Sequence, residues 1–397
     1  MTLSSLGLLA AVPWLSHPAT PGFFAARSDL APARAVWIHW SDEAYLAGPP
    51  TLPVVVDAIA ALAPHVGVRI VVDHARQIRE AERVLERREV PRDRYRFAVV
   101  PGADRWLRDV GPQFLVGADG RRRIADFRYT MYGQIDPANP WAVRVEGMDR
   151  AVARLLGYRT IASRLVSEGG NHEIGPDGTL MAVEGIELQR NPGWTREAIA
   201  DELRRVLGVR QVLWIPGEPL AMRKSSAGIL PDGTYPSSVT GGHADEFVRF
   251  GDGGTVLLAQ VPAEERRRCP VAARTHECLE RARAAIEADG RYRIVRVPTP
   301  APIFARYDTD PAEAWQVRQF GGAVPGQSIR YRLTTSYLNF VVANGAVLLP
   351  QYGTERDVIA EAAFARAFPR RRVVPIDVTA VNHGGGGLHC LTQNEPE

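Results

Sequence analysis

Short apolar runs alternate along the chain with longer stretches in which apolar positions recur at helical spacing. The runs are rich in β-branched residues and carry apolar side chains on both faces, which is typical of strands buried on both sides of a sheet. On this pattern we predict strands at Ala35–His39, Val68–Val72, Tyr95–Val100, Gln211–Ile215, Thr255–Ala259, Ala346–Pro350 and Val373–Asp377.

The stretches between these runs have the amphipathic period of helices. We predict helices at Val54–Leu62, Arg76–Arg88, Asp149–Leu156, Thr195–Leu207, Pro270–Asp289 and Glu355–Phe368. Thr195 and Thr354 can accept hydrogen bonds from first-turn amides, and Gly157, Gly208 and Gly290 suit a left-handed C-cap. The alternation predicts an α/β protein, and because no long linker interrupts it we expect one continuous domain over residues 30–397.

The segment before this domain, residues 1–29, opens with an apolar stretch from Leu3 to Leu15, and small residues follow between Ala19 and Ala26. It resembles the apolar centre of a secretory signal without the basic leader of such signals. We expect either a truncated export signal or an uncleaved apolar arm, and we favour an exported, periplasmic protein over a cytoplasmic one. No stretch approaches the roughly 20 apolar residues of a membrane span.

The composition is that of an ordinary globular protein, with 45% apolar and 23% charged residues and a formal net charge of +3. Lys224 is the single lysine, and the longest basic clusters, which include Arg266–Arg268 and Arg370–Arg372, are three residues each. Solvated faces explain such clusters, so the sequence gives no support for a nucleic-acid partner.

The chain has three cysteines, Cys269, Cys278 and Cys390. The first two border or lie within the predicted helix from Pro270, where nine residues rise by about 13 Å. A disulfide between them would be too stretched, so we expect both thiols to be free.

Four consecutive glycines, Gly384 to Gly387, lead up to Cys390 near the end of the chain. Because glycines are costly to order, a folded chain keeps them where the backbone approaches something closely or adopts positive φ. We interpret that neighbour as a substrate and Cys390 as a nucleophile. The alternative, a disordered tail, is disfavoured by the apolar Val378, Val381 and Leu388. The run matches no phosphate-binding or dinucleotide motif, and no helix is predicted after it.

Four other segments are polar where a core strand or helix would not be. They are Asp104–Pro112, Glu168–His172, Gly241–Glu246 and Thr335–Asn339. If Gly241–Glu246 is a strand, His243 and Asp245 share one face of it while Glu246 points away.

A cysteine, a histidine and several carboxylates together suggest attack on a carbon atom that is held by ionic pairs. A guanidinium fits, because it is planar, cationic and bound bidentately by carboxylates. Each segment also has a plainer interpretation. Asp104 and Asp109 can pair with Arg105 or Arg108, Glu168 can cap a turn, and a lone histidine is more often structural than catalytic.

The order of five motifs, Trp-x-Arg-Asp-x-Gly-Pro, Glu-Gly-Gly, Gly-His-x-Asp, Ser-Tyr-x-Asn-Phe and Gly-Gly-Gly-x-His-Cys-x-Thr-Gln, resembles the agmatine deiminase family. The same broad family includes the Porphyromonas-type peptidylarginine deiminases. The resemblance runs from about Asp104 to Pro396. It implies a pentein fold, in which five ββαβ-type modules surround a pseudo-fivefold axis that carries the active site. Residues 30–397 would then be a single deiminase catalytic domain.

Carried over to this sequence, the resemblance implies that Cys390 is the nucleophile and His243 the general acid and base. Asp109, Glu168 and Asp245 would be the carboxylates that grip the guanidinium. The motif residues are spaced along the chain as if successive modules each delivered a loop to one centre.

The same resemblance places Trp106, Asn339 and Gly387 among the substrate-binding residues. In the implied chemistry the Cys390 thiolate attacks the guanidinium carbon and His243 protonates the departing ammonia. His243 then activates the water that hydrolyses the amidino-thioether. No cofactor and no metal ion are implied.

The implied reaction is the hydrolysis of a linear amidine, agmatine, to N-carbamoylputrescine and ammonia, a step in the formation of putrescine and other polyamines. One departure bears on the substrate: residues 220–240, with Arg223 and Lys224, replace the acidic, glycine-rich run common in agmatine deiminases. This basic pair would repel an ammonium and attract a carboxylate, so a peptidylarginine or free-arginine deiminase that gives citrulline remains an alternative. The other interpretation is a surface hairpin around Pro231–Gly233.

Three further classes stay open. A metal-dependent hydrolase would use His243, Asp245, His389 and Cys390, but no metal motif of known spacing is present. An inactive guanidino-binding protein and an amidinotransferase would use the same groups without hydrolysis. The sequence leaves open whether the chain forms a homo-oligomer, and the partner we expect is a small guanidino molecule or a peptidyl arginine.

Overall fold

The computed structural model describes residues 23–134, 139–310 and 319–397. The apolar stretch from Leu3 to Leu15 lies outside these residues. Phe24–Ala26, which we placed in the N-terminal segment, form strand β1 and pair antiparallel with β5 (Gln113–Gly117). The packed part of the chain therefore begins before residue 30.

Five of the six sheets in the described part of the chain share one arrangement, in which one strand of an antiparallel pair continues, through a helical connection, into a parallel neighbour that follows it in the chain. Their strands are β5 with β6 (Arg122–Arg128) and β7 (Arg159–Val166); β8 (Glu173–Ile174), β9 (Thr179–Val183) and β10 (Gln211–Ile215); β12 (Val248–Gly251), β13 (Thr255–Gln260) and β14 (Arg293–Pro298); β17 (Val341–Val342), β18 (Ala346–Gln351) and β19 (Arg372–Asp377); and β20 (Thr392–Pro396), β2 (Ala33–His39), β3 (Gly67–Val72) and β4 (Tyr95–Val99).

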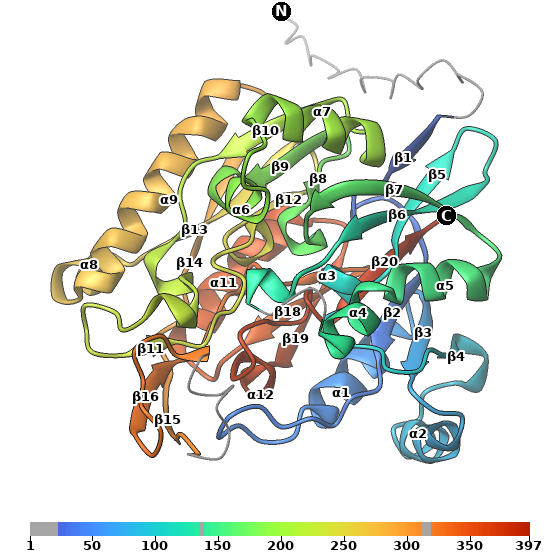
Figure 1. Cartoon of the computed structure of the whole chain (residues 1–397), viewed down its shortest axis with the longest axis horizontal. Helices are drawn as coiled ribbons and strands as arrows, with labels where there is room; N and C mark the ends of the chain where they lie inside the picture. Colours follow the sequence, from blue (N-terminus) through green and yellow to red (C-terminus); the bar gives the residue numbers. More distant parts are fainter. Residues whose placement is uncertain (1–22, 135–138, 311–318) are drawn as a thin grey trace, which may run out of the picture.

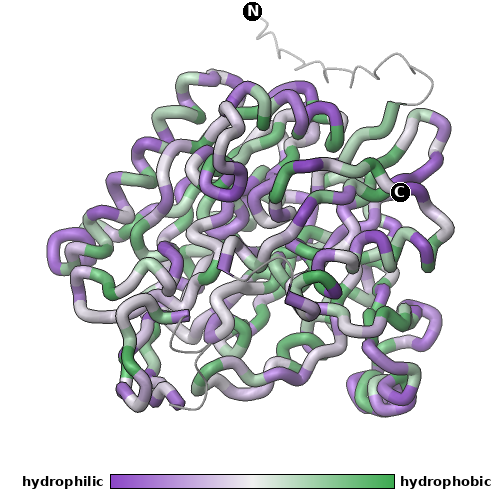
Figure 2. The backbone as a smooth tube through the Cα atoms, viewed as in Figure 1, coloured by the Kyte–Doolittle hydropathy of each residue, from purple (hydrophilic) through white to green (hydrophobic). Residues whose placement is uncertain are grey.

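Helices connect the parallel strands of these sheets, because parallel neighbours need a crossover. They are α1 (Leu52–Leu62), α2 (Arg76–Arg87), α4 (Pro140–Glu146), α5 (Met148–Leu156), α6 (Glu184–Arg190), α7 (Arg196–Leu207), α8 (Ala263–Arg268), α9 (Pro270–Asp289) and α11 (Glu355–Ala367). Figure 1 shows α2, α5, α7 and α9 at the periphery of the molecule, with strands toward its middle. Hydrophilic and hydrophobic residues alternate along the outer helix α9 (Figure 2).

The predicted α/β class is confirmed, and every predicted strand and helix is present with ends within two residues of the prediction. The Thr195 hydroxyl accepts from the backbone amide of Ala198 at 3.2 Å. Gly157, Gly208 and Gly290 end their helices with φ of 69°, 63° and 76°. The cysteines outside the glycine-rich terminus, Cys269 and Cys278, are both free thiols, as predicted.

The sequence predictions missed the largely apolar, buried strands β5 and β9. Other strands that they missed are polar or half exposed. They include β6, β7 and β14, and also β15 (Phe304–Asp308) and β16 (Ser328–Arg332), which form the sixth sheet with β11 (Tyr235–Pro236). In β7 only Leu165 is buried, so the strand carries no apolar run that a pattern could detect. Among the described helices, none combines the length and apolar character that crossing a bilayer requires.

The last strand closes the first sheet. β20 pairs antiparallel with β2, and the Trp37 indole donates to Glu395 Oε2 at 2.9 Å. Figure 1 shows this strand, red, beside the blue strands β2 and β3. The second and the last strand of the described chain therefore share one sheet. The chain segment just before β20 is held against the middle of the molecule.

Truncation of a core side chain should destabilise this framework. Ile70 on β3 is fully buried and Val358 on α11 is 70% exposed. We expect Ile70→Ala to lower the free energy of unfolding by about 2 to 5 kcal/mol, because it leaves a cavity. Val358→Ala should change it by less than about 0.5 kcal/mol. Urea denaturation followed by circular dichroism measures both, and equal losses in the two variants would contradict the assignment of the core.

Candidate active site

The residues that the sequence analysis singled out occupy one recurring position in the fold. Each lies just before the strand β5, β8, β12, β17 or β20, each of which forms an antiparallel pair in one of the five similar sheets. These are Asp109 before β5, Glu168 before β8, His243 and Asp245 before β12, Asn339 before β17 and Cys390 before β20. Equivalent loops of five sheets thus supply the site, and the contacts below bring the loops together.

Short helical turns, rather than strands, present most of these side chains. Asp109 lies in α3 (Leu107–Val110), Glu168 precedes the turn η3 (Gly169–Asn171), and Asp245 lies in the turn η6 (Ala244–Glu246). The prediction that His243 and Asp245 share one face of a strand is therefore wrong, because the chain turns at this point. Both side chains nevertheless reach the same site.

Cys390 is 2% exposed and is fixed by Asn339. The Asn339 side-chain amide donates to Cys390 Sγ at 3.1 Å. Its carbonyl oxygen accepts from the backbone amides of His389 at 2.9 Å and of Cys390 at 3.2 Å. Asn339, predicted to bind substrate, therefore contacts the sulfur and the backbone of the turn that carries it.

The glycine run approaches other parts of the protein closely, as its composition predicts. A Cβ on Gly384 or Gly386 would lie 3.0 or 2.5 Å from the Trp106 ring, and one on Gly387 would lie 2.8 Å from Asn339 Oδ1. Gly385 has a φ of 86°. The sequence analysis took the close neighbour to be a substrate, whereas here the protein's own side chains need the room. The run thus lets Trp106 and Asn339 pack directly against the backbone next to Cys390.

His243 is fully buried between two carboxylates. Its Nε2 lies 3.3 Å from Glu168 Oε2, and its Nδ1 lies 3.6 Å from Asp109 Oδ1. Burial alone would lower the pKa of His243, but the charges of Asp109, Glu168 and Asp245 raise it to about 9. At neutral pH this histidine is therefore an imidazolium that can donate a proton.

Glu168 is held as an anion. It accepts from Arg190 Nε at 2.9 Å as well as from His243. Burial would raise the pKa of Glu168, but Arg190 and His243 hold it at about 2. The carboxylate is therefore ionised, and its hydrogen bonds are already taken up by protein groups.

Asp109 is bonded differently from what the plain ion-pair interpretation expects. Its Oδ1 accepts from the backbone amide of Gly170 at 2.8 Å and its Oδ2 from the Tyr132 hydroxyl at 2.9 Å. The neighbouring Arg105 pairs with Glu43, and Arg108 pairs with Asp29. Burial raises the pKa of Asp109, and the charge of His243 opposes this shift.

Glu246 Oε2, His243 Nδ1 and Asp245 Oδ1 are buried atoms of the described site that have no hydrogen-bond partner. The latter two atoms face Gly170: a Cβ on this glycine would lie 2.6 Å from His243 Nδ1, 2.8 Å from Asp109 Oδ1 and 3.3 Å from Asp245 Oδ1. An unpaired buried polar group costs about 1 to 3 kcal/mol. A polar ligand that reaches these atoms would offset that cost, so they mark where a ligand is expected.

The thiol itself is in an unfavourable place for ionisation. Burial, followed by the charges of Asp245 and Asp109, raises the pKa of Cys390 well above its usual value, and a backbone hydrogen bond at Gly387 opposes the shift. Without a ligand Cys390 is therefore a thiol. A cation bound among the carboxylates would remove much of this penalty.

Several residues of the site escaped the sequence analysis. Tyr132 adopts a left-handed φ of 58° and contacts the His243 ring at 5.9 Å between centroids. Arg190 and Asp29 lie far in sequence from the groups they pair with. Glu246, predicted to point away, is buried and accepts from the Thr240 hydroxyl at 2.6 Å, and burial raises its pKa to about 8. None of these contacts has a local motif that would reveal it.

The segment 220–240 combines both of its predicted interpretations. The turn at Pro231–Gly233 is present, with the Gly233 amide donating to the Leu230 carbonyl at 2.9 Å. Arg223 donates to the carbonyl of Ala227, within its own segment. Lys224 instead donates to the carbonyl of Tyr132, beside the site. Burial and the charge of Arg190 lower the pKa of Lys224 to about 8.

Among residues 23–134, 139–310 and 319–397, no group of three or more His, Cys, Asp or Glu side chains is arranged to hold a metal ion. The reactive groups described at the site are its thiol, its imidazolium and its carboxylates.

Comparisons with known proteins identify a family that matches this chain. The model of the Porphyromonas-type peptidyl-arginine deiminase family matches residues 26–396. The agmatine deiminase of Pseudomonas putida is 32% identical over 395 residues, which span 96% of this chain and 97% of that protein.

Two solved structures share the fold. The agmatine deiminase of Enterococcus faecalis has a TM-score of 0.72 at 22% identity, over 94% of this chain and 96% of that chain. A cysteine-to-serine variant of the C. jejuni agmatine deiminase with substrate bound has a TM-score of 0.72 at 15% identity, over 96% and 99%.

A side chain at Gly170 should not fit. Gly170→Ala would push a methyl group against His243 and Asp109, and we expect it to lower the free energy of unfolding by about 1 to 3 kcal/mol. Gly147→Ala is a matched control, because its Cβ would meet nothing closer than 3.5 Å. Urea denaturation compares the two variants. If Gly170→Ala were as stable as Gly147→Ala, the close approach of these polar groups to Gly170 would be refuted.

The raised pKa of His243 predicts how stability depends on pH. A group whose folded pKa of about 9 exceeds its ordinary 6.5 stabilises the fold fully below pH 6.5 and loses this effect as pH rises through 9. We expect the wild type to lose roughly 3 kcal/mol more stability than His243→Gln between about pH 6 and about pH 10. Denaturant titrations at each pH measure this difference, and parallel curves for the two proteins would show that His243 is not held protonated.

Proposed function

This chain belongs to the Porphyromonas-type peptidyl-arginine deiminase family, and from that premise we propose that it hydrolyses agmatine to N-carbamoylputrescine and ammonia. One observation carries the proposal: a buried cysteine, an imidazolium and three carboxylates meet around two polar atoms that lack a partner. A planar cation with several N–H donors is the ligand that these carboxylates, with the unpaired Asp245 Oδ1 among their oxygens, select.

The sheets support the finer architecture that the resemblance implies. We propose that the five sheets of shared topology are five modules around a pseudo-fivefold axis, the pentein arrangement. In support, each module delivers the loop before its first strand to the same site.

Asp245 and Asp109 are the carboxylates best placed to hold the guanidinium. Asp245 Oδ1 is unpaired, and Asp109 Oδ1 lies across Gly170 from it. Glu168 adds negative charge, while its hydrogen bonds orient His243 and Arg190. Trp106 packs along the glycine run and is proposed to line the pocket.

The substrate cation prepares the nucleophile. As it enters, its charge offsets the carboxylates that raise the pKa of Cys390, and the thiol releases its proton to solvent. Asn339 and the backbone at Gly387, which both hydrogen-bond the sulfur, then stabilise the thiolate.

Two steps complete the reaction. The thiolate attacks the guanidinium carbon, His243 gives its proton to one amino group, and ammonia leaves, which forms a cationic amidino-thioether. His243, now neutral, takes a proton from water as the hydroxide adds to the same carbon. Collapse of this second intermediate breaks the carbon–sulfur bond, regenerates the thiolate and releases the ureido product together with a proton.

Lys224 supports a second candidate substrate. Its ammonium lies against the Tyr132 carbonyl, where Arg190 and Glu168 influence its charge. A free arginine or a peptidylarginine carries a carboxylate or carbonyl that could face this lysine, and its product would be citrulline. An inactive guanidino-binding protein is disfavoured, since every reacting group is in place.

Ammonia release tests the proposal directly. We expect the wild type to release ammonia from agmatine, measured in parallel with free arginine and a peptidylarginine. Cys390→Ala should lower turnover by at least about 1,000-fold, because the covalent step has no substitute nucleophile, yet it should still bind agmatine in calorimetry.

Cys278→Ala is the matched control, since it removes another buried thiol outside the site and should leave turnover unchanged. Turnover of arginine or peptide alone would replace the substrate assignment. Failure of the wild type to release ammonia from all three compounds would refute the deiminase proposal for these substrates. Transfer to an added acceptor amine, in place of hydrolysis, would reveal an amidinotransferase.

A further inference from the structure

His389, the residue before the nucleophile, is held at both ring nitrogens. Its Nδ1 lies 2.7 Å from Asp245 Oδ2, and its Nε2 lies 2.8 Å from Asp29 Oδ2. The ring is 2% exposed. The mechanism above uses Asp245 but assigns nothing to His389 or Asp29.

Both carboxylates are ionised, so they can only accept hydrogen bonds. Burial would raise the pKa of Asp29, but Arg108, His389 and Arg249 hold it well below its usual range. Burial likewise opposes ionisation of Asp245, and His389 and then His243 lower its pKa. Two ionised acceptors at hydrogen-bond distance require a proton on each ring nitrogen. His389 is therefore hydrogen-bonded to a carboxylate at each ring nitrogen, next to Cys390.

We infer that Asp29 and His389 form a positioning pair that sets the orientation of the Asp245 carboxylate and the charge next to Cys390. The inference rests on the deiminase function proposed above. Asp29 Oδ2 binds His389 Nε2, and His389 Nδ1 binds Asp245 Oδ2. Asp245 Oδ1 is thereby left facing the unpaired Nδ1 of His243, where the guanidinium is to bind.

The carboxylate needs this external support because the terminal torsion of an aspartate is soft. Cys390 Sγ lies 3.7 Å from the same Oδ2. The thiol already donates to this oxygen, and without the His389 proton it would be the only side chain to do so, which would keep Cys390 protonated and draw Asp245 away from the substrate. The pair thus keeps Asp245 Oδ2 hydrogen-bonded to the protein and leaves Asp245 Oδ1 for the ligand.

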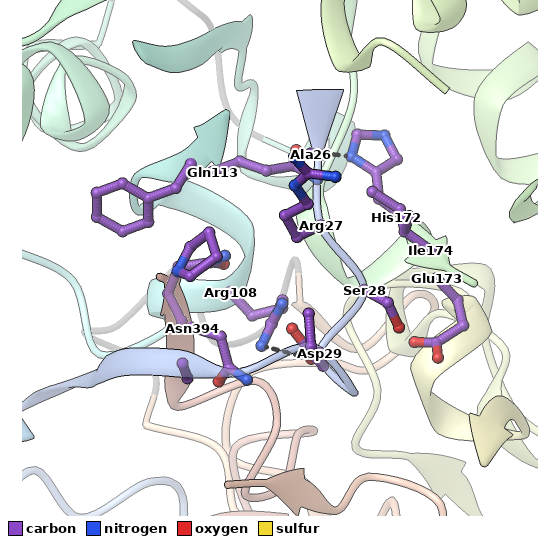
Figure 3. Close-up of a pocket in the computed structure, with 15 residues that line it drawn as sticks. Ala26, Arg27, Ser28, Asp29, Arg108, Gln113, His172, Glu173, Ile174 and Asn394 are labelled. Atoms are coloured by element: carbon purple, nitrogen blue, oxygen red, sulfur yellow. Dashed lines mark hydrogen bonds and ion pairs between the residues drawn. The ribbon is translucent and has the colours of Figure 1, made fainter. Parts of the chain in front are cut away.

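Asp29, whose side chain is 14% exposed, borders a small cavity. This cavity of about 20 Å³, room for roughly one water molecule, is lined by Asp29, Arg108, Gln113, His172 and Glu173, among other residues, but not by His389, Asp245 or Cys390. Figure 3 shows Asp29 and Arg108 pointing toward one another within it. The cavity therefore lies beyond Asp29 as seen from the nucleophile. Arg108 and Arg249 reach Asp29 Oδ2 at 3.1 and 3.4 Å and keep the carboxylate in place.

A purely structural role is the competing explanation, because Asp29 and His389 are 360 residues apart and join two ends of the chain. Such a role would affect stability without affecting thiol chemistry. Glu173→Gln is the matched control. Glu173 is another buried carboxylate of the same cavity, it pairs with Arg249 at 2.5 Å, and none of its hydrogen bonds or ion pairs involves His389.

Asp29→Asn should impair catalysis and thiol reactivity, whereas Glu173→Gln should not. We expect Asp29→Asn to lower kcat/KM by about tenfold or more, mainly through KM, the size typical when the partner behind a ligand-binding group is removed. Equal losses in the two variants would overturn the inference.

Alkylation of Cys390 by iodoacetamide gives a readout that needs no turnover. The titratable groups around the sulfur are Asp245 and Glu246 of η6 and Asp109 of α3, which act on Cys390, together with His243 and His389, which act on Asp245. Asp29→Asn leaves all of them in the chain but removes the carboxylate that binds His389 Nε2. The pH at which the alkylation rate rises should therefore be higher in Asp29→Asn than in the wild type or Glu173→Gln. Superimposable profiles would overturn the positioning role even if the deiminase function fails.

Rescue by a conservative change provides the third arm. An asparagine at position 389 can still donate to Asp245, whereas an alanine cannot. We expect His389→Asn to retain at least about tenfold more kcat/KM than His389→Ala, with both variants checked for an unchanged circular dichroism spectrum. Equal activity of His389→Ala and wild type would overturn the inference.

Discussion

Burial of ionised carboxylates next to a thiol is the constraint on which the rest of the site depends. Asp109, Glu168 and Asp245 are shielded from water, and each such charge is costly unless it is paired. Arg190 and His243 compensate Glu168, and the hydrogen bond with His389 compensates Asp245. Two atoms without a hydrogen-bond partner, His243 Nδ1 and Asp245 Oδ1, face the space beside Gly170. The carboxylates therefore favour the binding of one cation, and the bound cation offsets the charges that raise the pKa of Cys390. Binding thereby makes the cysteine reactive.

The fold supplies such a centre because it brings equivalent loop ends together on rigid supports. The site residues that the sequence predicted and that lie just before β5, β8, β12, β17 and β20 each have a backbone that is fixed within a few residues of a sheet. The glycine run adds close packing of Trp106 and Asn339 behind the sulfur. Flexible loops would not hold buried charges at hydrogen-bond distances, whereas strand ends do.

The predicted elements carry a clear apolar pattern, and several of the missed strands do not, although the apolar strand β9 was missed as well. Val68–Val72 is apolar on both faces and was predicted as a strand, while β7 is half exposed and was not. Cys390 and His243 were found through local motifs. The sequence analysis identified His243 and Asp245 as a pair on a strand, although a turn presents them.

Contacts between distant segments were beyond the sequence. Asp29 gave no signal, because its partners Arg108, Arg249 and His389 are distributed along the whole chain. Tyr132 gave none either, since its left-handed backbone occurs without a glycine. The closure of β20 on β2 also bears on biogenesis. A nascent chain emerges from the ribosome with β2 first and the nucleophile last, so β2 keeps an open edge until synthesis reaches β20. The reactive thiol thus enters its buried setting only after every other part of the site has been translated, and a nascent polypeptide cannot display an assembled centre.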